Sequence, residues 1–127
     1  MSFGSRWIAS SLTSDQIVDF YEGDTFKIDL PSQHPLFGDD LSIRVLGIDT
    51  PEMKGTSDEI KALANQAKNR TQELLREADL IVLKNPERGK YFRVVAEVWI
   101  DGESLGEMLK GEGLAKDYNG EGARPEW

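Results

Sequence analysis

The side chains best placed to do chemistry lie in one short stretch, RVLGIDTPE, at positions 44–52. The stretch begins as a strand of branched apolar residues and ends at a proline, which cannot continue a paired ladder. Arg44, Asp49 and Glu52 serve no packing purpose in such a strand, because a buried charge is costly unless it is paired. Opposite charges where a strand leaves the core suggest a site that holds a cation and an anionic substrate together. The alternative from these residues alone is a salt-bridged strand end followed by a surface turn.

The geometry of a strand adds one condition to this site. Side chains alternate between the two faces of a strand, so Arg44 and Asp49 point to opposite faces if the strand is unbroken. If both side chains serve one site, the strand must bend between them. Gly47 is the expected place, because glycine inside a strand often marks a bulge or a bend.

A further carboxylate, Asp24, directly precedes a strand predicted at 25–30. It shares the parity of Phe26 and Ile28, the expected core positions of that strand, and is therefore predicted to face inward. An inward carboxylate beside a turn is a candidate metal ligand. The alternative is an aspartate that caps the turn by accepting hydrogen bonds from backbone N–H groups.

Composition narrows the class of protein. The chain has 127 residues, a net charge of −8 and no cysteine, which fits one globular domain without disulfides, a thiol nucleophile or a cysteine metal site. The single histidine, His34, argues against a zinc site or a serine–histidine triad. The acidic charge argues against tight, non-specific retention of nucleic acid, although it leaves room for a local basic cleft.

Location and partners follow only in outline. No apolar run approaches the ~20 residues that a membrane span needs, so no membrane partner is expected. The first residues lack the apolar core of a secretory signal. The cytoplasm is therefore the default location, and a secreted or periplasmic location is the alternative if a signal has been removed. A monomer is expected.

The apolar patterns predict three strands, one long helix, two strands and a short helix. This order is typical of an OB-fold, a mixed α+β architecture, mainly β, with five barrel strands, a helix between strands 3 and 4 and here a short C-terminal helix. Residues 1–15 are expected to be a lead-in, 16–118 the barrel domain and 119–127 an irregular tail. The expected strands are 16–21, 25–30, 41–49, 80–84 and 91–100, the expected loops include 31–40 and 85–90, and the expected helices are 58–78, with a capping box of Thr56 and Glu59, and a short segment between Ser104 and Gly111.

With these elements and side chains in this order, the chain resembles the staphylococcal nuclease (thermonuclease) family, whose members have an SNase-like OB-fold. The resemblance covers about residues 16 to 118, and the order and spacing of its landmarks make it specific. The landmarks are EGDT at 22–25, R-x4-DTPE at 44–52, YFR at 91–93, DG at 101–102 and GLAK at 113–116.

The resemblance implies a calcium-dependent nuclease that hydrolyses phosphodiester bonds of DNA and RNA with little sequence or sugar specificity, and a single-stranded nucleic acid as partner. Asp24 and Asp49 would ligate Ca²⁺ through their side chains, and Thr50 would add its backbone carbonyl. These are the hard oxygen ligands that Ca²⁺ prefers. Two carboxylates held close together repel one another without a cation. Calcium is therefore expected to stabilise the fold.

The resemblance also implies roles around the phosphate. Glu52 would orient or deprotonate the attacking water, while Arg44 and Arg93 would hold the phosphate and stabilise the charge that develops on it. A guanidinium suits this task because its planar, permanently charged fork matches phosphate oxygens. Lys90 and Tyr91 match positions that contact a substrate phosphate.

The chain departs from the family pattern at several places. Glu22 stands where the family usually has Asp, and Phe92 stands where it has Gly beside the second arginine. The loop at 31–40 is longer than in the staphylococcal member. The family's third helix is expected to be shortened or missing, with Trp127 covering the surface instead.

A non-catalytic OB-fold module that binds nucleic acid or a phosphorylated ligand is the alternative function. A module whose site has decayed usually lacks one of the acids or arginines, and this chain retains the full set, which favours the enzyme. The retained residues are Asp24, Arg44, Asp49, Glu52 and Arg93.

Overall fold

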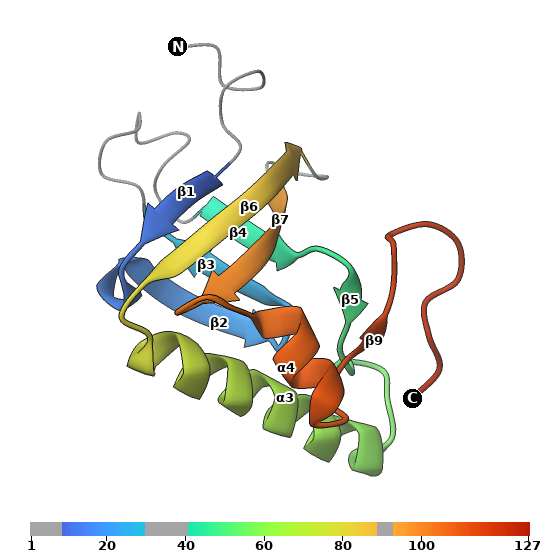
Figure 1. Ribbon diagram of the computed structural model, residues 1–127. Coiled ribbons are helices and arrows are strands. Elements are labelled where there is room, and N and C mark those ends of the chain that lie inside the picture. The colour runs from blue at the N-terminus through green and yellow to red at the C-terminus, as the bar shows by residue number, and fades with distance from the viewer. Residues whose placement is uncertain (1–8, 30–40, 89–92) are drawn as a thin grey trace.

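The fold is a strongly curled sheet with a long helix across one end (Figure 1). It is seen in a computed structural model that describes residues 9–29, 41–88 and 93–127. In the described chain seven strands form this sheet in the order β1-β6-β7-β4-β3-β2, with β8 paired to β7. The strands are β1 (Ala9–Leu12), β2 (Ile17–Glu22), β3 (Thr25–Ile28), β4 (Leu41–Val45), β6 (Ile81–Arg88), β7 (Arg93–Ile100) and β8 (Glu103–Ser104).

Shorter elements complete the chain. A small antiparallel pair joins β5 (Ile48–Asp49) to β9 (Lys116–Asp117) beside the sheet (Figure 1). The helices are η1 (Ser14–Gln16), α3 (Asp58–Glu77) and α4 (Leu105–Gly111). This curled half-barrel, with two α-helices in the described ranges, has the mixed α+β, OB-like architecture predicted from the sequence. The long helix follows the third predicted strand. No helix among the described residues is long and apolar enough to span a bilayer.

The core lies inside the curl of the sheet. Alternate residues of β3 and β4 are buried, with Phe26, Ile28 and Ile43 fully inaccessible to solvent, as expected where one face of a strand packs and the other does not. The helix α3 buries a stripe of mostly small side chains, which lets its backbone approach the sheet closely. The buried residues of this stripe are Ala64, Ala67, Thr71 and Leu75.

The strongest difference from the sequence-based expectation is β1. We expected residues 1–15 to be an unpatterned lead-in, yet Ala9–Leu12 pairs antiparallel with β6 along its whole length. The segment reads ASSL, and its only large apolar side chain is Leu12, which is 1% exposed. Pairing here depends on the backbone rather than on an alternating apolar pattern, so the pattern could not reveal it.

Two further local predictions were wrong. The expected loop at 85–90 is, up to Arg88, a continuation of β6 across a register shift between Lys84 and Glu87. A bulge with Asn85 at a φ of 52° absorbs the extra residues. The N-cap of α3 is not Thr56 but Ser57, whose hydroxyl accepts a hydrogen bond from Ile60 N–H at 3.3 Å.

Other local predictions were confirmed. The turn at Asp101-Gly102 joins β7 to β8, and the Ser104 hydroxyl caps α4 by accepting from Glu107 N–H at 3.3 Å. The helix predicted at 58–78 is α3 to within one residue. Residues 31–40, with His34, lie outside the described residues.

Two segments far apart in the sequence meet in a parallel pairing of β4 with β7. In this register Ser42 lies opposite Arg93 and Arg44 lies opposite Val95. Partnered residues of neighbouring strands point to the same face of a sheet, and so do residues two apart in one strand. The register therefore places Arg44 and Arg93 on one face, the face opposite the buried Ile43.

The turn between β2 and β3 is held against α3 without space for a side chain. A Cβ atom added to Gly23 would lie 2.9 Å from the Ala67 Cβ and 3.0 Å from the Thr50 Cγ2. The buried Thr71 hydroxyl also donates a hydrogen bond to the Gly23 carbonyl at 2.7 Å. This contact fixes the position of the residue that follows, Asp24.

Gly23→Ala is therefore expected to destabilise the protein by about 1–3 kcal/mol, the usual cost of overpacking a close contact. Urea unfolding measures the change in free energy. Gly111→Ala is the matched control, since a Cβ there meets nothing within 4 Å, and helix propensity predicts an unchanged or slightly higher stability. Equal stability of the two variants would contradict the close contact.

Candidate active site

The site begins with a break in the strand predicted at 41–49, in which a bend at Gly47 was expected if Arg44 and Asp49 serve one site. β4 ends at Val45 and β5 begins at Ile48, and between them Gly47 adopts a φ of 90°, a left-handed conformation that glycine enters readily. Tyr118 N–H donates to the Gly47 carbonyl at 2.9 Å, and this hydrogen bond ties the bend to the C-terminal segment. The predicted bend at this glycine is confirmed.

Because of this bend, one arginine reaches two aspartates. The Arg44 Nη1 lies 3.2 Å from the Asp24 Oδ2, and its Nη2 lies 3.6 Å from the Asp49 Oδ1. The two carboxylate side chains are only 3% and 1% exposed, against 16% for Arg44. One partly buried positive charge thus contacts two buried negative charges, an arrangement that a salt-bridged surface turn does not need.

Asp24 is held from several directions. Its Oδ1 accepts a hydrogen bond from the neighbouring Thr25 hydroxyl at 2.9 Å, and its Oδ2 accepts one from Thr50 N–H at 3.1 Å. The predicted inward orientation of Asp24 is confirmed. The turn-capping alternative does not describe it, because the backbone N–H that it binds belongs to a residue 26 positions away rather than to its own turn.

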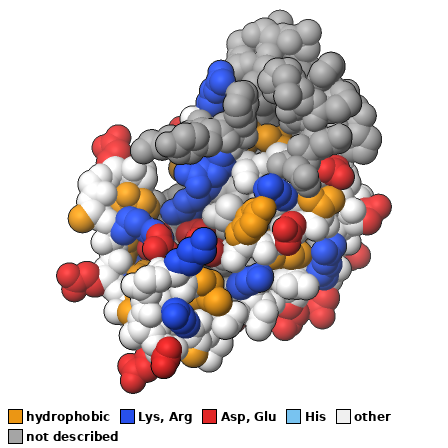
Figure 2. All heavy atoms as spheres, turned by 180° about the vertical axis from the view of Figure 1, so that it is seen from behind, with side chains coloured by type: hydrophobic (Ala, Val, Ile, Leu, Met, Phe, Trp, Pro, Cys, Tyr) orange, Lys and Arg blue, Asp and Glu red, His pale blue; other side chains and the backbone are white. Residues whose placement is uncertain are grey.

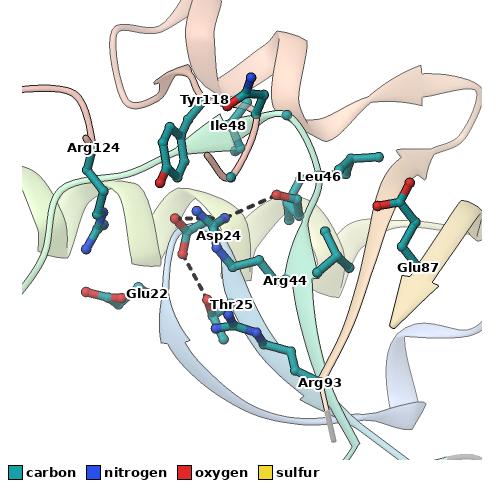
Figure 3. A pocket seen from close by; sticks show the side chains of 15 residues that line it. Glu22, Asp24, Thr25, Arg44, Leu46, Ile48, Glu87, Arg93, Tyr118 and Arg124 are labelled. Carbon is teal, nitrogen blue, oxygen red and sulfur yellow. Dashed lines mark hydrogen bonds and ion pairs between the residues drawn. The ribbon is translucent and has the colours of Figure 1, made fainter. Parts of the chain in front are cut away.

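A pocket of about 430 Å³ opens on this face of the sheet. Figure 3 shows Asp24, Arg44 and Thr25 in contact at its centre, with Arg93 reaching toward them from the start of β7. The Arg93 Nε is buried and has no hydrogen-bond partner among the described residues. A buried donor of this kind is costly to leave unsatisfied, so it is a position where an anionic oxygen is favoured. The lining also includes Glu22, Glu87, Tyr118 and Arg124.

Residues of the C-terminal tail complete the surroundings of the second aspartate. Arg124 Nε donates to the Asp49 Oδ1 at 2.9 Å, and the Trp127 indole N–H donates to the Asp49 Oδ2 at 3.1 Å. Arg124 also forms a close ion pair with Glu52 through its Nη1. The sequence analysis missed Arg124. Its only signal is that it is the one arginine in a glycine-rich tail without regular pattern.

Glu52, the predicted base, lies at the rim rather than inside the pocket. It is half-buried, its side chain is 43% exposed, and its carboxylate pairs with Arg124. Its carbonyl accepts a hydrogen bond from the Thr56 hydroxyl at 2.9 Å, which holds the loop before α3. Lys90 and Tyr91, predicted to contact phosphate, lie outside the described residues, as does Phe92.

The oxygen donors in and beside the pocket suit a hard cation; Asp24 lines the pocket, and Asp49 and Thr50 lie beside it. Asp24 and Asp49 offer carboxylate oxygens, and the Thr50 hydroxyl is buried without a hydrogen-bond partner among the described residues. In that part of the chain no three acidic or histidine side chains converge into a ligand set by themselves. A bound Ca²⁺ would therefore need backbone, phosphate or water oxygens besides the aspartates, which its usual six to eight oxygen ligands allow.

Glu22 is a further acid beside this pocket. Burial raises its pKa above the ordinary value of 4.5, and the nearby charge of Asp24 raises it further. A hydrogen bond from Met53 N–H to its Oε2 at 3.3 Å acts in the opposite direction and lowers the pKa. The surroundings of Glu22 therefore disfavour its ionised form.

The comparison with known families agrees with this geometry. A sequence profile of the family described as Staphylococcal nuclease homologue matches residues 42–126. The chain belongs to the staphylococcal nuclease family. The matched region contains the bend, Asp49, Glu52 and both arginines of the pocket, Arg44 and Arg93.

Individual relatives of this SNase-family chain carry endonuclease or thermonuclease names. It is 36% identical over 107 residues to the SPbeta prophage-derived endonuclease YokF of Bacillus subtilis (strain 168). This alignment covers 83% of this chain and 33% of that protein. It is 33% identical over 108 residues to Endonuclease YncB of the same organism, covering 84% and 47%. It is 26% identical over 102 residues to the Thermonuclease of Staphylococcus hyicus, covering 80% and 57%. The chain therefore spans between a third and somewhat over half of these relatives.

The raised pKa of Glu22 predicts a pH dependence of stability. As the pH rises from about 4.5 through the folded-state pKa, the folded protein holds more protons than the unfolded chain, so stability falls. Glu22→Gln removes this loss and keeps an acceptor for Met53 N–H. Its thermal midpoint in chelator should exceed that of the parent by a margin that grows between about pH 4 and pH 7. The exposed Glu103→Gln is the control, and a pH-independent difference for Glu22→Gln would contradict the prediction.

Proposed function

We propose that this chain is a calcium-dependent nuclease that hydrolyses phosphodiester bonds of DNA or RNA with little sequence or sugar specificity. One observation carries the proposal. Arg44 bridges the buried carboxylates of Asp24 and Asp49, while Arg93, which lines the same pocket, has a buried Nε without a hydrogen-bond partner in the described part of the chain. This pairs an acidic site for a cation with a basic site for an anion, as phosphodiester hydrolysis requires. Membership of the staphylococcal nuclease family and the names of its relatives support it.

The cation side of the site has a definite task. Asp24 and Asp49 would hold Ca²⁺ with Thr50, and the ion when bound would polarise the phosphate and neutralise part of its charge. Because both aspartates are almost fully buried, their orientation is set before substrate arrives. Such preorganisation spares the reorganisation that a mobile carboxylate would undergo during the reaction.

The arginines act on the phosphate itself. Arg93 would donate its free Nε–H to a phosphate oxygen, and Arg44 would turn part of its fork from the aspartates toward the same group. Both then oppose the negative charge that grows on the equatorial oxygens as water attacks phosphorus in line with the leaving oxygen. Glu52 would accept the proton of that water, or orient it, once its carboxylate is free of Arg124.

The charge distribution bears on the substrate. The chain carries a net charge of −8, so long-range attraction for nucleic acid is weak. Figure 2 shows Lys and Arg side chains gathered toward the middle of one face, with most acidic side chains at its margins. A local basic field of this kind can hold a few phosphates while the bulk charge repels a long polyanion. We therefore propose single-stranded DNA or RNA, bound loosely, as the substrate.

The alternative is a binding module without catalysis. It would use the same arginines to hold a phosphorylated ligand, and it would not need Glu52. Only the enzyme needs Glu52 to act on the attacking water, so a measurement of cleavage separates the two functions. In the structure Glu52 pairs with Arg124 at the rim of the pocket.

Cleavage of single-stranded DNA and RNA should require calcium and stop in chelator. Glu52→Gln and Arg93→Ala should each lower the rate by ~10²–10³, the usual loss when one group that stabilises a transition state is removed. Arg70→Ala and Glu103→Gln, which change exposed side chains away from the pocket, should cut at the parent rate. Product formation on labelled oligonucleotides measures all of these rates.

The results of these assays distinguish the nuclease from the binding module. Binding of oligonucleotide without calcium-dependent cleavage would favour the binding module. A Glu52→Gln variant as fast as the parent would remove Glu52 from the mechanism.

Calcium should also stabilise the folded protein, because the ion relieves the repulsion between Asp24 and Asp49. A ligand at 100 times its Kd adds about 2.7 kcal/mol to the free energy of unfolding. A thermal melt with and without millimolar calcium measures the shift, and Asp24→Asn should lose it. An unchanged melting temperature of the parent would contradict calcium binding at this site.

A further inference from the structure

Side chains of the protein already occupy most of the carboxylate of Asp49. The Asp49 Oδ1 accepts a hydrogen bond from the Arg124 Nε at 2.9 Å, and its Oδ2 accepts one from the Trp127 indole N–H at 3.1 Å. The Arg44 Nη2 lies 3.6 Å from the same Oδ1. A second nitrogen of Arg124, Nη2, also donates to Oδ1. A carboxylate has about four lone-pair directions. Arg124 takes both directions of Oδ1 and Trp127 takes one of Oδ2.

The same guanidinium holds a second functional acid. Arg124 forms a close ion pair with Glu52 through the nitrogen that does not contact Asp49. One side chain of the tail therefore lies between a proposed metal ligand and the proposed base. It supplies the positive charge that a buried carboxylate requires when no metal is bound.

The segment that carries Arg124 is held at its root and again at its last residues, where the Lys116 ammonium donates to the Glu126 carbonyl. At its root, β9 pairs with β5, and Tyr118 N–H binds the Gly47 carbonyl at 2.9 Å. Beyond Tyr118 the residues at 119–124 are exposed. At the far end the Lys116 ammonium lies 4.5 Å from the centre of the Trp127 ring.

The exposure of residues 119–124 suits a segment that can leave, because its release uncovers little buried apolar surface. The Arg124 side chain is 41% exposed, although Asp49 beneath it is only 1% exposed. Removing the arginine from Asp49 therefore opens the carboxylate without opening the apolar core. The buried partner, Arg44, has no comparable freedom, because it lies on the central strand β4.

We propose that Arg124 and Trp127 form a removable counter-ion clamp on Asp49 and Glu52, which closes the site in the metal-free protein and must release Asp49 before a divalent cation binds. This inference rests on the proposed function. Calcium and Arg124 compete for the same oxygens, since their like charges repel and the lone pairs can serve only one of them. Release of Arg124 also frees the Glu52 carboxylate, so that metal binding and exposure of the base occur together.

Calcium affinity tests the clamp without any measurement of cleavage. Titration calorimetry of the chelator-treated protein compares the parent with Arg124→Ala, Arg124→Lys and the control Arg70→Ala. Arg70 pairs with Glu73 and Glu112 on the exposed side of α3, so its removal changes the net charge equally. We expect Arg124→Ala to bind calcium about tenfold more tightly than the parent, from the loss of one adjacent like charge. Arg124→Lys should lie between them, and Arg70→Ala should match the parent.

Hydrogen exchange of the parent provides a second measurement that needs no variant. Backbone amides in the segment 119–127 should exchange faster with calcium than with chelator, while amides of β4 and β7 should exchange more slowly or unchanged. If Arg124→Ala does not fold, this exchange experiment and the lysine variant still decide the outcome.

The possible results separate the clamp from the function on which it rests. Calcium binding by the parent together with equal or weaker binding by Arg124→Ala overturns the clamp, leaves the nuclease proposal standing and makes Arg124 a positioning residue for Glu52. Absence of binding in the parent and in both Arg124 variants overturns the clamp and calcium dependence together. Binding by Arg124→Ala alone supports the clamp in its strongest form.

Discussion

The burial of two negative charges is the constraint on which the rest of the site depends. Asp24 and Asp49 are 2% and 1% exposed, and an unpaired carboxylate in that position would be protonated or would unfold the segment around it. Arg44 compensates both from the strand between them. The bend at Gly47 and the close approach of Gly23 to α3 bring these three side chains together.

The sequence revealed this part of the site because the relevant physics is local. Parity along a strand placed Asp24 inward and required a bend between Arg44 and Asp49, and the glycine between them was the only residue suited to it. The backbone conformation of Gly47 agrees, with a φ of 90°. The family resemblance added the expected roles, and the match at residues 42–126 confirms the family membership itself.

The parts that sequence reasoning missed depend on contacts made across the fold. Ala9–Leu12 joins the sheet through backbone pairing with β6, although its side chains carry no alternating pattern. The bulge at Asn85 lets β6 continue through a proline that otherwise signals a loop. Arg124 lies in a tail without periodicity, so no local rule could place it 75 residues away on Asp49. Such contacts are set by the path of the whole chain.

The parallel pairing of β4 with β7 has a consequence for how this protein could diversify. Arg44 and Arg93 sit two positions apart in register on adjoining central strands, so their separation is set by the repeat of the sheet, about 4.8 Å between strands and 3.3 Å per residue. Insertions in the surrounding connections leave that separation untouched. Changes in these connections can therefore reshape the rim of the pocket while the distance between the two guanidinium-bearing positions stays the same.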